Sequence, residues 1–186
     1  MNTYENQKMT VRRIFADCSL LFMTGAVIGW IYEVLLHLVA DAAFVNRGML
    51  HGPWLPIYGI GCLLMVGLKK AVGDRPVLYF VLSTAACGLA EYFTSWLMEL
   101  IYNMRWWDYS DLPLNLNGRI FLGGLLGFGA AGCLFVYILL PVLAKKYNNI
   151  STHTKEIIAF IFTLTFAADM IMSAAFPNMG FGITSM

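Results

Sequence analysis

The feature that most constrains this chain is a series of long apolar stretches, each bounded by charged or turn residues. They run from Ile14 to Ala40, from Pro53 to Leu68, from Pro76 to Tyr102, from Ile120 to Ala144 and from Ile157 to Phe176. A helix needs about 20 apolar residues to cross a bilayer, and every stretch except the second reaches that length. The second must cross a thinned region or enter the membrane only in part. The pattern predicts an all-α fold, a polytopic transmembrane bundle of about five spans within one domain, residues 1–186.

Composition supports a lipid environment. The chain has 186 residues, of which 59% are hydrophobic and 12% are charged. Soluble domains carry about 25% charged residues, so a domain this small has too few charges to cover its surface in water. The composition therefore excludes a soluble enzyme and a disordered tail. A net charge of +1 also excludes a polyanion-binding surface, so we expect the lipid bilayer and no nucleic acid as a partner.

The distribution of basic residues predicts an orientation. If all five stretches cross the membrane, most of the basic residues outside the spans fall on one side: Lys8, Arg12, Arg13, Lys69, Lys70, Arg75, Lys145, Lys146 and Lys155. The other side receives only Arg47, Arg105 and Arg119. Cytoplasmic loops are the ones enriched in Lys and Arg, so the N-terminus is expected in the cytoplasm and the C-terminus outside. The three outer arginines run against this bias, and each needs a local reason for its position.

Ionisable residues inside the apolar stretches identify a candidate site. Glu33 and Glu91 both fall in the outer half of their stretches, where a carboxylate facing lipid would be costly. Glu91 and Glu99 share one face of a helix, because they are eight residues apart. Arginine can hold a buried carboxylate through two hydrogen bonds. We therefore expect an outward-opening polar cluster of Glu33, Glu91, Glu99, Arg47, His51, Asp108 and Arg119. The alternative is a set of structural ion pairs that pin the loops to the helices.

Other chemistry is weakly indicated. The chain contains no Gly-rich Walker loop and no HExxH motif, so any coupling to ATP requires another subunit, and neither a metal nor a cofactor is predicted. No catalytic nucleophile stands out, and an enzymatic role is disfavoured without being excluded. Asp169 lies deep in the last stretch with no partner that the sequence can name, so it could pair with another subunit. Gly25-x-x-x-Gly29 and Gly123-x-x-x-Gly127 predict faces for close helix packing.

Two motifs resemble a known family. The first is the run Arg47-Gly48-Met49-Leu50-His51-Gly52-Pro53-Trp54-Leu55-Pro56-Ile57-Tyr58-Gly59, and the second combines Trp106-Trp107-Asp108-Tyr109 with Asn115-Leu116-Asn117-Gly118-Arg119. Together they resemble the bacterial membrane family catalogued as putative ABC-transporter type IV, the CmpB-like permeases. The resemblance implies an integral-membrane permease of the bacterial cytoplasmic membrane. It adds Tyr58, Trp107 and Asn117 to the expected substrate-binding residues.

The sequence thus predicts a membrane protein of the transport class. Its polar cluster would bind a small polar solute or headgroup through Arg47 and Arg119, and Glu91 or Glu33 would be a protonatable coupling group. Five spans are few for a complete conduit, so a homo-oligomer or a partner membrane subunit is expected, and a cytoplasmic ATPase could join it. Two other functions stay open: an intramembrane enzyme acting on a lipid-linked substrate at the outer leaflet, and a non-catalytic accessory subunit.

Overall fold

A computed structural model describes residues 3–40, 42–179 and 184–185. The helices are α1 (Thr3–Ala40), α2 (Pro56–Val72), α3 (Pro76–Tyr102), α4 (Leu122–Leu134), the π-helical turn η1 (Phe135–Leu139), α5 (Leu140–Asn148) and α6 (Thr152–Ala175). Four strands of two residues each are β1 (Met104–Arg105), β2 (Asn115–Leu116), β3 (Ile120–Phe121) and β4 (Thr184–Ser185). The predicted all-α fold is confirmed, and the strands only shape loops.

Four segments are long and apolar enough to cross a membrane. They are Val11–Ala40, Pro76–Tyr102, Leu122–Asn148 and Thr152–Ala175. Helix α2 contains 17 residues, which at 1.5 Å per residue gives about 26 Å, less than the thickness of a typical hydrocarbon core. It begins at Pro56 instead of Pro53, because proline disfavours the helical conformation at the residue before it, and Leu55 is extended with φ −115° and ψ 104°. The structure is that of a helical membrane protein.

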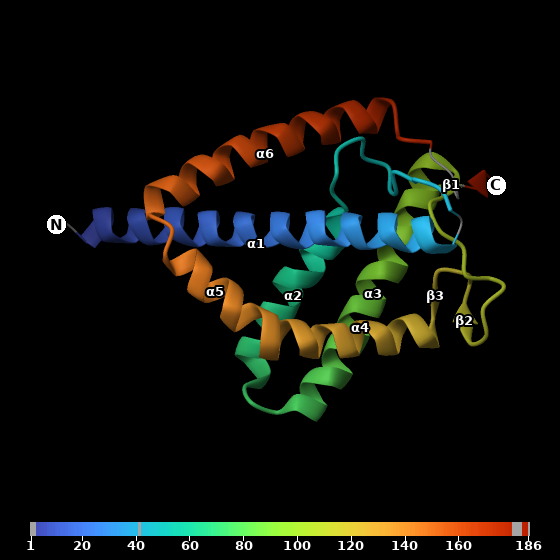
Figure 1. Ribbon diagram of the computed structural model, residues 1–186, viewed down its shortest axis with the longest axis horizontal. Coiled ribbons are helices and arrows are strands. Elements are labelled where there is room, and N and C mark those ends of the chain that lie inside the picture. The colour runs from blue at the N-terminus through green and yellow to red at the C-terminus, as the bar shows by residue number, and fades with distance from the viewer. Residues whose placement is uncertain (1–2, 41, 180–183, 186) are drawn as a thin grey trace.

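Helix α1 lies in the middle of the molecule, between the other helices (Figure 1). Figure 1 shows α1 running across the middle, with α6 along one side and α2, α3 and α4 on the other. The N-terminal parts of α1 and α6 are joined by Lys155, whose Nζ lies 2.8 Å from Asp17 Oδ1. Loops 42–55 and 103–121 gather with the C-terminal end of α6 at the opposite end of the molecule (Figure 1).

The chain between α1 and α2 runs back alongside α1. Trp30 Nε1 donates to Asn46 Oδ1 at 2.6 Å, and the Leu55 N–H donates to the carbonyl of Ala26 at 2.9 Å. Ala26 is near the middle of the apolar segment Val11–Ala40, so α2 starts beside the centre of α1 and not at its end. Non-helical backbone at membrane depth is tolerated only where it is buried in protein and its polar groups are satisfied.

The first of the two predicted small-residue faces packs within the chain. A Cβ added at Gly25 would lie 2.6 Å from Cys62 Sγ and 3.0 Å from the Tyr58 carbonyl oxygen. The α1–α2 contact is therefore closer than any larger residue allows. In the second face, Gly127 has no atom within 4 Å of such a Cβ, so it is not packed against another described element.

Proline explains the one irregularity of the fourth apolar stretch. Pro141 lacks the N–H that would bond to the Tyr137 carbonyl, and its ring would clash with that turn. The chain inserts an extra residue as the π-helical turn Phe135–Leu139, and the helix continues to Asn148.

Candidate functional site

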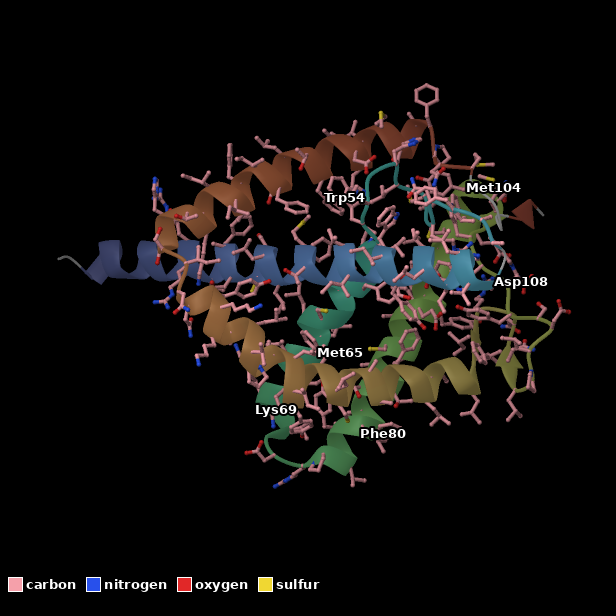
Figure 2. The ribbon with its side chains drawn as sticks, viewed as in Figure 1. Trp54, Met65, Lys69, Phe80, Met104 and Asp108 are labelled. Carbon is pink, nitrogen blue, oxygen red and sulfur yellow. The ribbon has the colours of Figure 1, made fainter. Side chains whose placement is uncertain are left out.

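Nine of the ten predicted site residues form two connected groups, one at the loop end of the bundle and one deeper between the helices. Figure 2 shows the labelled Asp108 at this end, where loop 103–121 meets α3 and α4, whereas the labelled Trp54 lies between α1 and α6. One group is centred on Glu99 and holds the loop. The other is centred on Glu33 and Glu91 and lies deeper. Glu91, Ser95 and Glu99 form a buried stripe along α3 that connects the two groups.

The Glu99 group is a clamp between α3 and loop 103–121. Arg105 binds the Glu99 carboxylate in a bidentate manner, with Nε 2.9 Å from Oε2 and Nη2 3.2 Å from Oε1. Arg119 Nη1 contacts the same Oε2 and lies 3.4 Å from Ser95 Oγ. Glu99 and Arg119 are both 8% exposed. Two guanidinium groups therefore share one buried carboxylate, which fixes both ends of the loop to one helix.

The hairpin that carries Arg119 is built from local turn chemistry. Asn117 and Gly118 have φ values of 54° and 65°, and the Arg119 N–H donates to the Leu116 carbonyl at 3.0 Å. Two successive positive φ angles define a type I′ turn, for which Asn-Gly is the preferred pair. The Asn-Gly dipeptide was therefore a signal for this hairpin, which we did not predict. Asn117 Nδ2 also donates to Tyr92 Oη on α3 at 2.8 Å.

Asp108 and Trp107 brace the other limb of the loop. Asp108 Oδ1 accepts hydrogen bonds from the Ser110 N–H at 2.9 Å and from Ser110 Oγ at 2.5 Å, and Oδ2 lies 3.6 Å from Arg105 Nη1. The Ser110 hydrogen bonds, together with the Arg105 charge, hold the pKa of the Asp108 carboxyl below its usual value. Trp107 Nε1 donates to the Arg119 carbonyl at 3.1 Å. Both predicted residues therefore shape the loop.

The deeper group joins α1, α2 and both loops. Tyr58 Oη donates to Glu33 Oε1 at 2.5 Å, and Arg47 Nε lies 3.8 Å from Glu33 Oε2. On α3, Glu91 is 6% exposed and accepts a hydrogen bond from Tyr109 Oη at 3.2 Å. Glu33 is close enough to act on Glu91 electrostatically. Carboxylates from two different helices therefore belong to this deeper group, and the one on α3 is bound by a tyrosine of the loop.

The pKa of the Tyr109 phenol depends on the burial and charges of this group. Burial, followed by the charges of Glu91 and Glu33 and the hydrogen bond to Glu91, raises the pKa of the Tyr109 phenol above its usual value, and Arg47 opposes the shift. The phenol thus stays protonated and remains a donor throughout the physiological pH range. The structural role of Tyr109 was not predicted, since a tyrosine in a loop gives no sequence signal for its partner.

Helix packing positions Tyr58. A Cβ added at Gly29 would overlap the Tyr58 ring. We expect Gly29→Ala to displace that ring, break its hydrogen bond to Glu33 and cost about 1–3 kcal/mol of stability, as overpacking does. Thermal unfolding in detergent measures the loss. The matched control is Gly61→Ala on α2, where nothing lies within 4 Å of the added Cβ. An equal loss in both variants would contradict a specific role for Gly29.

His51 is separated from the cluster. Its N–H donates to Asp169 Oδ1 at 3.2 Å, and its Nε2 lies 2.8 Å from the Phe176 carbonyl. Asp169 explains the position of His51. Its carboxylate also accepts hydrogen bonds from the Gly52 N–H at 2.9 Å, from Trp54 Nε1 at 2.6 Å and from Ser173 Oγ at 3.0 Å. These bonds draw the loop toward α6. The partners of Asp169 are therefore within the same chain.

Neither a metal-binding group nor either of the two hollows described below coincides with these residues in the described part of the chain. Within the described chain, no group of three or more His, Cys, Asp or Glu side chains is arranged to hold a metal ion. Two hollows have mainly apolar linings and contain no residue of the cluster. One, of about 500 Å³, lies at Arg75–Leu78 and Val81. The other, of about 360 Å³, lies between α1 and α6 and includes Leu20, Met23 and Phe162.

Comparison with known proteins gives one match. A family model described as "Putative ABC-transporter type IV" matches residues 20–174, a range that contains both polar groups and all of the transmembrane helices apart from the ends of α1 and α6. No curated protein and no solved structure matches the chain. The match covers most of the sequence, and the apolar helices agree with a transport role. The chain therefore belongs to the "Putative ABC-transporter type IV" family and is a transport-related membrane protein.

Proposed function

We propose that this protein is the membrane component of a transporter in which the Glu33–Glu91 pair binds and releases a proton as a small polar or charged solute, or a headgroup, moves. One observation carries the proposal. Glu91 is buried, and among the described residues its carboxylate accepts a hydrogen bond from Tyr109. Among the described residues, no basic side chain lies within ion-pair distance of Glu91. A carboxylate without a basic partner inside a membrane segment is costly, and such residues typically mark functional sites.

Charge balance supports the proposal. The acidic side chains of the two groups are Glu33, Glu91, Glu99 and Asp108, and the basic ones are Arg47, Arg105 and Arg119. One proton on the Glu33–Glu91 pair neutralises this described set. Two carboxylates that are close together cannot easily both ionise, because each charge disfavours the other. Binding of a proton then offsets the cost of burying the second charge.

The test is to remove the proton site without removing its volume. Glu91→Gln keeps a side-chain oxygen that can accept from Tyr109. We expect it to abolish the infrared band of a protonated carboxyl group in the lipid-reconstituted protein. We also expect it to lower proton flux into pyranine-loaded liposomes by about tenfold or more, as loss of a positioned acid–base group does.

Asp111→Asn is the matched control, because Asp111 is an exposed acid of the same loop. It should keep both signals. A Glu91→Gln protein with an unchanged carboxyl band and unchanged proton flux would overturn the proposed function. That result would favour the second candidate, a non-catalytic accessory subunit. The closed Glu99 clamp supports this candidate, because it shows that part of the cluster holds a loop in place.

The proposal includes an assembly. A chain of this size has few helices for a complete conduit, so we propose that it works as a homo-oligomer or with a partner membrane subunit. The family supports an ATPase partner on the cytoplasmic side. The excess of basic residues near the α2–α3 and α5–α6 turns supports an orientation in a bacterial cytoplasmic membrane with the N-terminus inside.

A further inference from the structure

Arg119 uses only part of its guanidinium group within the protein. Nη1 contacts Glu99 and lies 3.4 Å from Ser95 Oγ. Nε is fully buried and has no hydrogen-bond partner in the described chain. A buried donor without a partner costs about 1–3 kcal/mol, and more when the group is charged. Arg119 is 8% exposed, so the edge formed by Nε and Nη2 has little access to bulk water.

This edge is the one that binds oxyanions best. Nε and Nη2 present two parallel N–H groups at the spacing of the two oxygens of a carboxylate or phosphate. The same protein shows the occupied form, because Arg105 uses its Nε and Nη2 on Glu99 at 2.9 and 3.2 Å. Arg119 reaches Glu99 with the opposite side of its guanidinium. Its bidentate edge is therefore not used by the Glu99 clamp.

Local charge favours an anion at that edge. Glu99 is shared by two guanidinium groups, so the buried part of the clamp carries one more positive than negative charge. Asp108 compensates on the Arg105 side, where it lies 3.6 Å from Arg105 and its side chain is 36% exposed. On the other side the Arg119 guanidinium carbon lies 5.7 Å from the centre of the Tyr92 ring. That ring covers a face of the guanidinium and leaves its edges free to donate.

We propose that the Nε–Nη2 edge of Arg119 binds an oxyanion, either a free phosphate or the phosphate of an anionic lipid headgroup. The inference rests on the proposed transport function and names the chemistry of the charged solute. Arg119 lies on the hairpin and not on a helix, directly after the Asn117–Gly118 turn. Movement of this hairpin relative to α3 would give the anion access to the edge.

The experiment compares two arginines that share one carboxylate. Arg119→Lys keeps a positive charge for Glu99 but removes the bidentate edge, and Arg105→Lys makes the same chemical change where that edge is already occupied.

Binding of radiolabelled inorganic phosphate to the full chain in detergent is measured by equilibrium dialysis. Binding of phosphatidylglycerol, with phosphatidylcholine as reference, is measured by native mass spectrometry. Arg119→Lys should weaken binding by about tenfold or more, the value of one charge-assisted hydrogen bond, and Arg105→Lys should retain it.

The two arms identify the source of the oxyanion. Binding of inorganic phosphate alone supports a free solute, and selective retention of phosphatidylglycerol supports a headgroup. If the wild-type chain binds neither probe, or if Arg119→Lys binds both as the wild type does, the inference is overturned. Arg119→Gln, measured in the same way, decides the matter if the lysine variant is not monodisperse. Glu91→Gln should still bind the oxyanion, so failure of the proton site and failure of this inference are distinguishable.

Discussion

Glu99→Ala is expected to destabilise the protein by about 3–5 kcal/mol, the usual result of removing one partner from a buried ion pair. The loss is large because the change leaves two guanidinium groups around an apolar site, with Arg119 only 8% exposed. Loop 103–121 would then lose its attachment to α3. In a chain of this length the loss corresponds to a fall of roughly 10 °C in melting temperature, measured by fluorescence-detected size exclusion after heating.

A double variant separates the buried charge from simple loss of packing. Glu99→Leu with Arg119→Met removes both charges and fills the space with apolar atoms, and should recover much of the lost stability. Arg105 can then turn to Asp108, which already lies 3.6 Å from its Nη1. If Glu99→Ala melts at the wild-type temperature, the clamp does not hold the loop.

Asp169→Ala is expected to have an effect of similar size, about 3–5 kcal/mol, for a different reason. Asp169 is the acceptor for two backbone N–H groups and the Trp54 indole, all in the segment that runs back along α1. Asp169 is only 8% exposed, so little water can take the place of the carboxylate as acceptor for these donors. The change should also shift tryptophan emission, because Trp54 would leave its place against Phe162 and Phe166 on α6.

Two further variants test this explanation. Asp169→Asn has the same shape but offers one acceptor oxygen instead of two, so it should lose much of the same stability. Asp74→Ala removes an acid from the exposed α2–α3 turn, where it pairs with Lys69, and should leave the melting temperature essentially unchanged. Equal melting of the Asp169→Ala and Asp74→Ala proteins would show that the returning segment does not depend on Asp169.

Some of the site was predictable from residue type and spacing. Glu91 and Glu99 had to share a face of α3, and an outer arginine had to meet a carboxylate, because lipid offers neither group a partner. Arg119 meets Glu99 and Arg47 meets Glu33 for this reason. The choice of Arg105 as the bidentate partner of Glu99 could not be predicted, since it depends on how a 17-residue loop, residues 103–119, closes over the helix.

Other features depended on distant contacts. His51 belongs to the same sequence motif as Arg47, yet it lies with Asp169, 118 residues further along the chain. The motif contains no residue of α6, so the sequence spacing predicted the wrong neighbours for His51. The start of α2 beside Ala26 also depends on contacts between segments distant in the chain. The backbone N–H groups of the returning segment need acceptors, and α1 and α6 supply them once they are packed.

By itself the sequence determined the class of fold: apolar stretches this long must be helices in lipid, because only there are their backbone groups and side chains both satisfied. It also determined that acids and arginines inside those stretches would seek each other. Only the tertiary structure decided the pairing, with one clamp at Glu99, one carboxylate pair at Glu33 and Glu91, and one anchor at Asp169. Pairing energies depend on the distance between the charges, and these distances arise from helix packing and loop closure between residues far apart in the chain.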